Sequence, residues 1–213
     1  MKQTESIKVW DPLIRIFHWS LVLFFAIAYI SGESDFETVH AWAGYIIVGL
    51  IAFRMLWGLI GSKHARFSDF VYRPATIKRY LKSLLSRHPK HYLGHNPAGG
   101  AMVLMMLVML ALVSWSGLLT YAAEGKGPLA AGSPITISNA YADDDWSGWG
   151  EGKRGHKGDD FWEDIHEAAA NMMLLLIAMH LAGVAVSSLL HGENLPRAMI
   201  TGRKKVCSED AQP

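Results

Sequence analysis

Four long apolar segments constrain this chain more than any other feature of its sequence. Each is close to the ~20 residues that are needed to cross about 30 Å of hydrocarbon. In lipid such a segment must be helical, because every backbone N–H and C=O group needs a partner within the protein. We therefore predict an all-α membrane four-helix bundle, in which residues 1–205 form one transmembrane domain and residues 206–213 a polar tail. The predicted spans cover residues 13–30, 39–60, 99–121 and 165–190.

The charges in the loops predict how the helices are oriented. Residues 61–97 contain eight basic residues and one acidic residue, whereas residues 122–164 contain nine acidic and four basic ones. Because Lys and Arg collect in cytoplasmic loops, we expect both termini and the middle loop to be cytoplasmic. The net charge of +1 gives no reason to expect a nucleic acid partner.

Two loops carry predictions of their own. Residues 74–87 place apolar side chains at helical spacing with Lys and Arg between them, which is typical of an amphipathic helix on the membrane surface. Residues 122–160 are rich in glycine and acidic residues and include Trp146 and Trp149. That loop is either a solvated connection or a docking surface for a partner with a basic patch.

Four histidines lie within the predicted membrane helices: His18, His40, His166 and His180. An ionisable side chain at membrane depth is costly, so each of them marks a candidate functional site. Antiparallel helices would place His18 and His180 toward the cytoplasmic face, and His40 and His166 toward the periplasmic face. His166 and His180 are 14 residues apart, which is about 21 Å along a helix with both rings within about 40° of one face.

Each depth-matched pair can supply two axial imidazoles to one haem iron, a common way to build a cofactor site in a helical bundle. We therefore predict two b-type haems, one ligated by His18 and His180 and one by His40 and His166. Coordination and packing would hold them, because the single cysteine, Cys207, lies in the polar tail and no haem-attachment motif is present. Irons without an open coordination position suit electron transfer, and no residue is predicted to be catalytic.

Two arginines are candidate cofactor-binding residues. Arg54 lies about 21 Å along its helix from His40, near the cytoplasmic surface. It either snorkels to that surface or pairs with a haem propionate, and Arg15 is a second candidate for the same role. Gly44 and Gly183 lie near the ligands and would make room either for a macrocycle or for close helix packing. The other histidines are expected in loops or at the membrane interface: His64, His88, His91, His95, His156 and His191.

Several motifs together resemble the bacterial cytochrome b561 family, which includes the b-type cytochrome subunit of nickel–iron hydrogenases. The resemblance rests on VWDPLIRIFHW at 9–19, HAWAG at 40–44, RMLWGLIG at 54–61, GHNPAGG at 94–100, and His166 with His180 at a spacing of 14. The resemblance implies a di-haem b-type cytochrome of the bacterial inner membrane that exchanges electrons with the quinone pool. It also implies that His18, His40, His166 and His180 are the axial ligands.

The resemblance leaves the redox partner open. We expect a periplasmic hydrogenase or dehydrogenase subunit or, because the acidic loop is longer than the connections in that family, a c-type cytochrome. The lipid bilayer surrounds the chain, and a homo-oligomer is compatible with the sequence. One alternative is a stand-alone quinone-linked oxidoreductase that acts on a small oxidant or reductant such as superoxide. Another is a haem-free metal transporter, although the chain has no His-Glu-x-x-His motif and almost no acidic residue within its spans.

Overall fold

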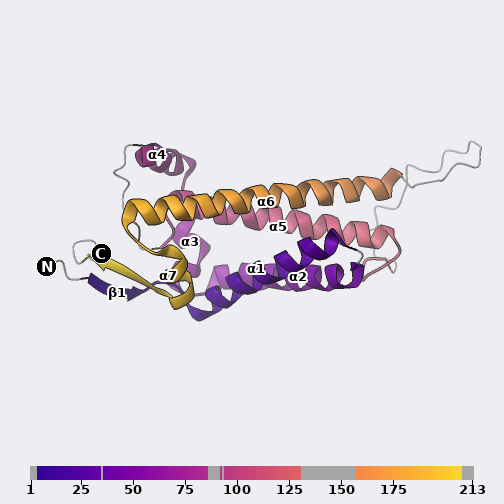
Figure 1. Ribbon diagram of the computed structural model, residues 1–213, viewed down its shortest axis with the longest axis horizontal. Coiled ribbons are helices and arrows are strands. Elements are labelled where there is room, and N and C mark those ends of the chain that lie inside the picture. The colour runs from indigo at the N-terminus through magenta and orange to yellow at the C-terminus, as the bar shows by residue number, and fades with distance from the viewer. Residues whose placement is uncertain (1–3, 35, 86–91, 93, 131–156, 208–213) are drawn as a thin grey trace, which may run out of the picture. The chain divides into compact units, whose positions relative to one another are not determined.

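A computed structural model describes residues 4–34, 36–85, 92, 94–130 and 157–207 of the chain. The described residues confirm the all-α class and the four predicted membrane segments. Most of the acidic loop, including both of its tryptophans, lies outside the described residues, as do His88, His91 and His156. The helices long and apolar enough to cross a membrane are α1 (Pro12–Gly32), α2 (Glu37–Ile60), α5 (Pro97–Ala123) and α6 (Lys157–His191) (Figure 1).

The chain divides into two compact units, and α5 and α6 each contribute to both. The first unit consists of Met1–Val108 and Leu174–Pro213, and the second of Met109–Met173. The first unit therefore contains α1 and α2 together with three of the four predicted ligand histidines. His166 belongs to the second unit.

Asp11 fixes the start of α1 against the end of α2. Its Oδ1 accepts a hydrogen bond from the Ile14 N–H at 2.9 Å, and Pro12 follows at the first helical position, where its missing N–H costs nothing. Its Oδ2 accepts from Trp57 Nε1 at 3.3 Å and from the Ser62 hydroxyl. Burial alone would raise the pKa of Asp11, but these hydrogen bonds outweigh it and hold that pKa below its usual value.

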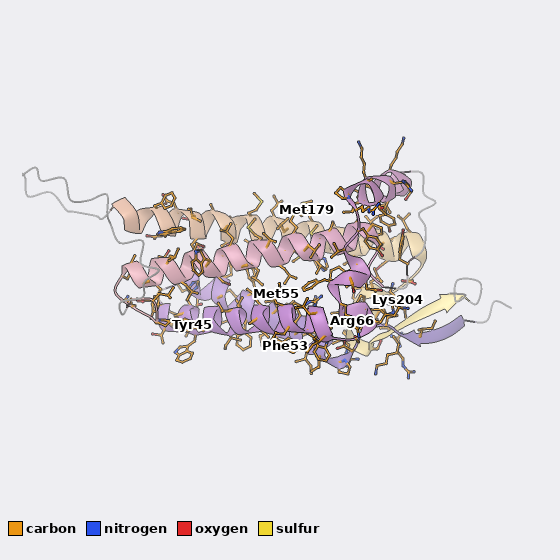
Figure 2. The ribbon with its side chains drawn as sticks, turned by 180° about the vertical axis from the view of Figure 1, so that it is seen from behind. Tyr45, Phe53, Met55, Arg66, Met179 and Lys204 are labelled. Atoms are coloured by element: carbon orange, nitrogen blue, oxygen red, sulfur yellow. The ribbon has the colours of Figure 1, made fainter. Side chains whose placement is uncertain are left out.

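The spanning helices expose much of their apolar surface. Met55 on α2 and Met179 on α6 are about half exposed, at 50% and 49% (Figure 2). Val108 and Leu189 are exposed more fully still. Large apolar surfaces of this kind mark contact with a partner or a membrane, and lipid suits them here because the helices have the length of membrane spans.

Between α2 and α5 the described residues form the short helices η1 (Lys63–Ala65), α3 (Phe67–Phe70) and α4 (Pro74–Leu85). Helix α4 agrees with the predicted amphipathic helix over its described residues. Tyr80 is buried and contacts Tyr92 at a ring-centroid distance of 5.7 Å, whereas Lys78 and Lys82 are exposed. The membrane-surface location of α4 stays a prediction.

The two ends of the chain pair as strands, which the sequence analysis did not predict. Strand β1 (Thr4–Lys8) runs antiparallel to β2 (Arg203–Cys207), which follows the short helix α7 (Leu195–Thr201). Gly202 makes the turn into β2 at a φ of 78°, and its carbonyl accepts from the Val9 N–H at 2.9 Å. The pairing places residues 4–8 beside residues 203–207, and the cytoplasmic location of the termini stays a prediction.

Candidate functional site

His18 and His180 lie close to each other in the first unit. They come from α1 and α6, far apart in the sequence, yet the two side chains are near enough to interact electrostatically. The Nδ1 atom of His18 is buried and has no hydrogen-bond partner among the described residues. The His18 ring also contacts Trp19 edge-on at a centroid distance of 5.1 Å. The two imidazoles that depth counting matched are thus within electrostatic range of each other, and their pairing at one haem stays a prediction.

His40 is hydrogen bonded to the helix that precedes it. Its Nδ1 lies 2.8 Å from the Ala28 carbonyl oxygen on α1. A carbonyl can only accept, so Nδ1 carries the proton and the lone pair of the neutral ring is on Nε2. Imidazole in this form can coordinate iron through Nε2, with its other N–H fixed by the backbone.

His166 is held in the same manner in the second unit. Its Nδ1 donates to the Val113 carbonyl oxygen on α5 at 2.9 Å and lies 3.3 Å from the Ser116 hydroxyl. The lone pair of this neutral ring is therefore on Nε2 as well. His40 and His166 belong to different units, so their pairing at one haem stays a prediction.

Arg54 is a buried cation at the depth of His18. Its side chain is only 3% exposed, and the guanidinium lies over the rings of Phe67 and Phe70, at 4.8 and 5.7 Å from their centroids. Phe17, next to His18, contacts Phe53, next to Arg54, at 6.3 Å, which brings these parts of α1 and α2 to the same level. The Nη1 atom of Arg54 is buried without a hydrogen-bond partner among the described residues, so an anionic group would fit beside it.

Arg15 also has a buried nitrogen without a hydrogen-bond partner among the described residues, its Nε. Its Nη1 lies 2.7 Å from the position that a Cβ at Gly202 would take, which places this arginine against the turn into β2. Of the two arginines, Arg54 is the more deeply buried. A cofactor-binding role for either of them stays a prediction.

The helix surface beside two of the histidines is open. Gly44 follows His40 by four residues and Gly183 follows His180 by three, so each glycine lies on the same helix face as its histidine. A Cβ added at either glycine would meet no atom within 4 Å. The histidine chemistry, the unpartnered nitrogen of Arg54 and these open faces fit a planar macrocycle with acidic side groups.

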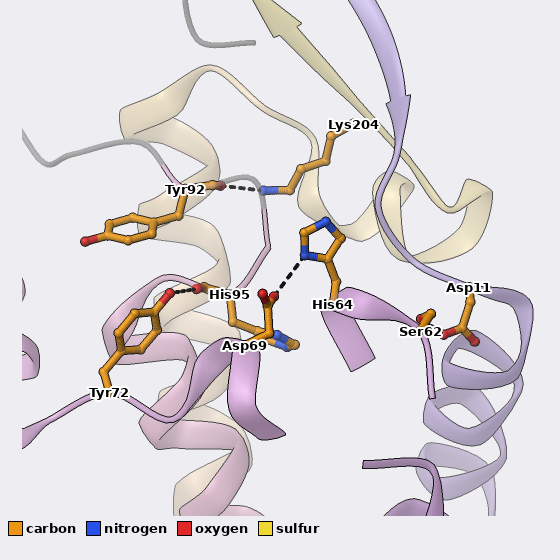
Figure 3. Close-up of polar contacts among 8 residues, drawn as sticks. All are labelled: Asp11, Ser62, His64, Asp69, Tyr72, Tyr92, His95 and Lys204. Carbon is orange, nitrogen blue, oxygen red and sulfur yellow. Dashed lines mark hydrogen bonds and ion pairs between the residues drawn. The ribbon is translucent and has the colours of Figure 1, made fainter. Parts of the chain in front are cut away.

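His95 lies in a loop, as expected, but the sequence analysis did not predict the polar cluster around it, which includes Asp69, Tyr72 and Lys204 (Figure 3). The His95 ring lies between Trp10 and Phe70, at centroid distances of 4.7 and 4.8 Å. Burial, reinforced by the charges of Arg54 and Lys204, lowers the pKa of His95 to about 3. The motif GHNPAGG at 94–100 includes His95, but it does not reveal these surroundings, because the other residues come from distant parts of the chain.

Two ion pairs flank this cluster. His64 Nδ1 lies 2.9 Å from the Asp69 carboxylate, and both side chains are partly exposed (Figure 3). Lys204 pairs with Glu193 at 3.1 Å, with 6% and 10% of the two side chains exposed. The second pair anchors β2, because it neutralises a cation that would otherwise be buried alone.

The comparisons with known proteins agree with the sequence motifs. The probable Ni/Fe-hydrogenase B-type cytochrome subunit of Azotobacter vinelandii is 30% identical over 154 residues, which are 59% of this chain and 63% of that protein. Proteins of the same description from Bradyrhizobium diazoefficiens and Rhodobacter capsulatus are each 27% identical. They match over 151 and 157 residues, which cover 57% and 60% of this chain and 60% and 59% of the two relatives.

The chain thus spans about 60% of the length of the curated relatives that it matches. No solved structure matches it. The family profile described as prokaryotic cytochrome b561 matches residues 9–202, nearly the whole chain. Together with four long apolar helices, this match makes the chain a multi-pass membrane protein of the cytochrome b type. The chain belongs to the prokaryotic cytochrome b561 family.

Proposed function

We propose that the chain is a di-haem cytochrome that passes electrons between a periplasmic redox partner and the quinone pool of the bacterial inner membrane. His18 and His180 would hold one haem, and His40 and His166 the other. The observation that supports this proposal most is the nearness of His18 and His180, two intramembrane imidazoles from distant parts of the chain. The backbone hydrogen bonds of the other two histidines give further support.

The haems would supply one-electron transfer, and the protein would supply ligation, charge balance and insulation. Two imidazoles on each iron leave no coordination position for oxygen or another small ligand. Arg54 would balance the charge of a propionate, since a guanidinium can bind a carboxylate through two parallel hydrogen bonds. The surrounding apolar side chains would keep water away from both sites.

The partner and the quinone are the finer parts of this proposal. The relatives are described as hydrogenase subunits, which supports a periplasmic hydrogenase as the partner. The acidic loop between α5 and α6 supports a c-type cytochrome with a basic surface as the second candidate. Quinone takes up two electrons and two protons when it becomes quinol, so it can link two one-electron transfers to the membrane pool.

A dithionite-reduced minus oxidised absorption spectrum with haem quantitation tests the proposal. We expect the purified chain to bind two b-type haems and His40→Ala to bind one. His64→Ala is the matched control, because His64 lies in η1, outside the spans, and pairs with Asp69. A colourless pure protein would overturn the proposal, as would a His40→Ala variant that keeps both haems.

A further inference from the structure

His40 lies against a small notch in α1. The Ala28 carbonyl accepts its Nδ1–H at 2.8 Å, and Gly32 lies four residues further along the same helix. A Cβ added at Gly32 would come within 3.0 Å of His40 Nδ1 and 3.1 Å of Cε1. Between them, the Ser31 hydroxyl donates to the Ile27 carbonyl at 2.7 Å and contacts that of Ala28 at 3.2 Å, so its polar atom stays within α1.

His166 lies against an equivalent notch in α5. The Val113 carbonyl accepts its Nδ1–H at 2.9 Å, and Gly117 lies four residues further along. A Cβ added at Gly117 would come within 2.8 Å of His166 Cε1, closer than real Cβ contacts allow. The Ser116 hydroxyl bonds to the carbonyls of Leu112 at 2.9 Å and Val113 at 3.1 Å within its own helix, and, unlike that of Ser31, it also lies 3.3 Å from the histidine Nδ1.

The spacing in both notches has one physical explanation. In an α-helix the Cα–Cβ bond tilts toward the N-terminus, so the side chain at position i+4 covers the carbonyl of residue i. Glycine at i+4 leaves that carbonyl open from the side, and a histidine of the next helix can bond to it. The segments AYISG at 28–32 and VSWSG at 113–117 follow the same pattern. In each, the carbonyl of the first residue accepts the histidine N–H, the fourth residue is serine and the fifth is glycine.

We propose that these two segments are histidine cradles and that Gly32 and Gly117 are positioning residues for the iron ligands His40 and His166. This inference rests on the proposed function, because it takes both histidines as ligands. Each cradle lies within a single unit and stands on its own distances. Under the proposed pairing of His40 with His166, both cradles would serve the same haem.

The cradles would set the properties of that haem in two ways. They fix the tautomer and orientation of each ring, so that Nε2 is the nitrogen presented to the iron. They also make each imidazole a stronger donor, because a hydrogen bond from Nδ1–H to a carbonyl raises the basicity of Nε2. A more basic ligand favours oxidised iron, so loss of a cradle should raise the midpoint potential of this haem.

Gly117→Ala and Gly32→Ala test the inference without weakening the helices, because alanine forms helix better than glycine. Gly49→Ala is the matched control in α2. Gly49 lies nine residues after His40, on the opposite helix face, and a Cβ there meets no atom within 4 Å. The readouts are the potentials of both haems in an equilibrium redox titration and their low-spin ferric electron paramagnetic resonance signals.

We expect Gly117→Ala to raise the potential of one haem, or to abolish its binding, and to shift the resonance signal of that haem alone. Gly32→Ala should change the same haem to a smaller extent, because its contact with the ring is less tight. Gly49→Ala should leave both haems unchanged. Unchanged or lowered potentials in both cradle variants would overturn the inference.

Failure of the proposed function would look different from failure of the cradles. A chain without haem, or a His166→Ala variant that keeps both haems, would remove the ligand assignment itself. If His166→Ala loses one haem while Gly117→Ala leaves both potentials and both signals unchanged, the ligands stand and only the cradles are excluded.

Discussion

The two predicted histidine pairs would offer the same imidazole ligands to a haem, but the four side chains lie in different surroundings. His40 and His166 each donate Nδ1–H to a helix carbonyl, whereas the buried Nδ1 of His18 has no hydrogen-bond partner among the described residues. Instead, a buried cation, Arg54, lies on α2 at about the same position along the helices as His18 on α1. Carbonyl bonds favour oxidised iron and a nearby cation favours reduced iron. The comparison predicts a higher midpoint potential for the haem of His18 and His180.

The largest expected effect tests whether the histidines act as pairs. His18→Ala, His180→Ala and the double variant should each retain one haem, because either loss removes the same site. His18→Ala combined with His40→Ala should retain none. Haem quantitation by the pyridine haemochrome spectrum distinguishes these cases. If the His18 and His180 variants each retained one haem but the double variant retained none, each histidine would serve a different haem.

The next largest effect is a pH dependence of stability caused by His95, which lies near Arg54. Its pKa is lowered from 6.5 to about 3, so the folded protein keeps it neutral where the unfolded chain binds a proton. Stability should therefore fall as the pH drops below about 6.5, by about 2 kcal/mol at pH 5. Thermal unfolding between pH 7 and pH 5 measures this slope, and His95→Gln should flatten it.

Tyr72→Phe is the control for His95, because the Tyr72 hydroxyl donates to the His95 carbonyl at 3.2 Å and does not ionise in this pH window. The slope should persist in this variant. An equally steep slope in His95→Gln would show that another group causes the pH dependence. It would contradict the claim that His95 stays neutral in the folded protein.

Arg54→Gln should lower the potential of the haem of His18 and His180 and leave the other haem unchanged. A unit charge at roughly 10 Å, with an effective dielectric constant near 20, contributes about 1 to 2 kcal/mol. That corresponds to roughly 40 to 90 mV for one electron. Redox titration measures the shift, and Arg54→Lys should restore part of it because the charge is kept. Equal shifts in the midpoint potentials of both haems would contradict the claim that Arg54 acts on only one of the two predicted histidine pairs.

The smallest effect is expected at Asp11. Asp11→Ala removes the N-cap of α1 and the hydrogen bonds to Trp57 and Ser62, which should cost about 1 to 2 kcal/mol of stability. Asp11 fixes the position of α1 along α2. On heating, the absorption band of the haem predicted at His18 and His180 should therefore broaden or shift before that of the other haem. Thermal unfolding followed at the haem absorbance measures both consequences. Loss of the other haem first would contradict the idea that Asp11 positions α1 against α2 next to the predicted haem of His18 and His180.

The sequence was sufficient to predict features that depend on counting along the chain. The spans follow from the length and composition of apolar segments such as that around Met106. The electrostatic contact between His18 and His180 agrees with the depths that the order of the spans and the helix rise predict, and their role as a ligand pair stays a prediction. Features that depend on contacts between segments were not predicted. The pairing of β1 with β2 joins short polar segments at opposite ends of the chain, and the neutral state of His95 depends on its burial and on the charges of Arg54 and Lys204.

The cradles lie between these extremes. The sequences AYISG and VSWSG can be seen in the printed chain, but nothing in them shows that a carbonyl in each accepts a hydrogen bond from a histidine. That role depends on how closely the next helix approaches, and the approach is set by side chains outside the motif. The open helix face at Gly44 has the same status, since an isolated glycine in a span fits both close packing and bulky ligands.

Whether the chain holds two separately ligated haems can be measured by an equilibrium redox titration of the purified protein, repeated with His18→Ala and His166→Ala. We expect two one-electron b-type components of different potential, of which His18→Ala removes the higher and His166→Ala the lower. A single component lost in both variants would contradict two separately ligated haems, and removal of the components in the opposite order would contradict their unequal surroundings.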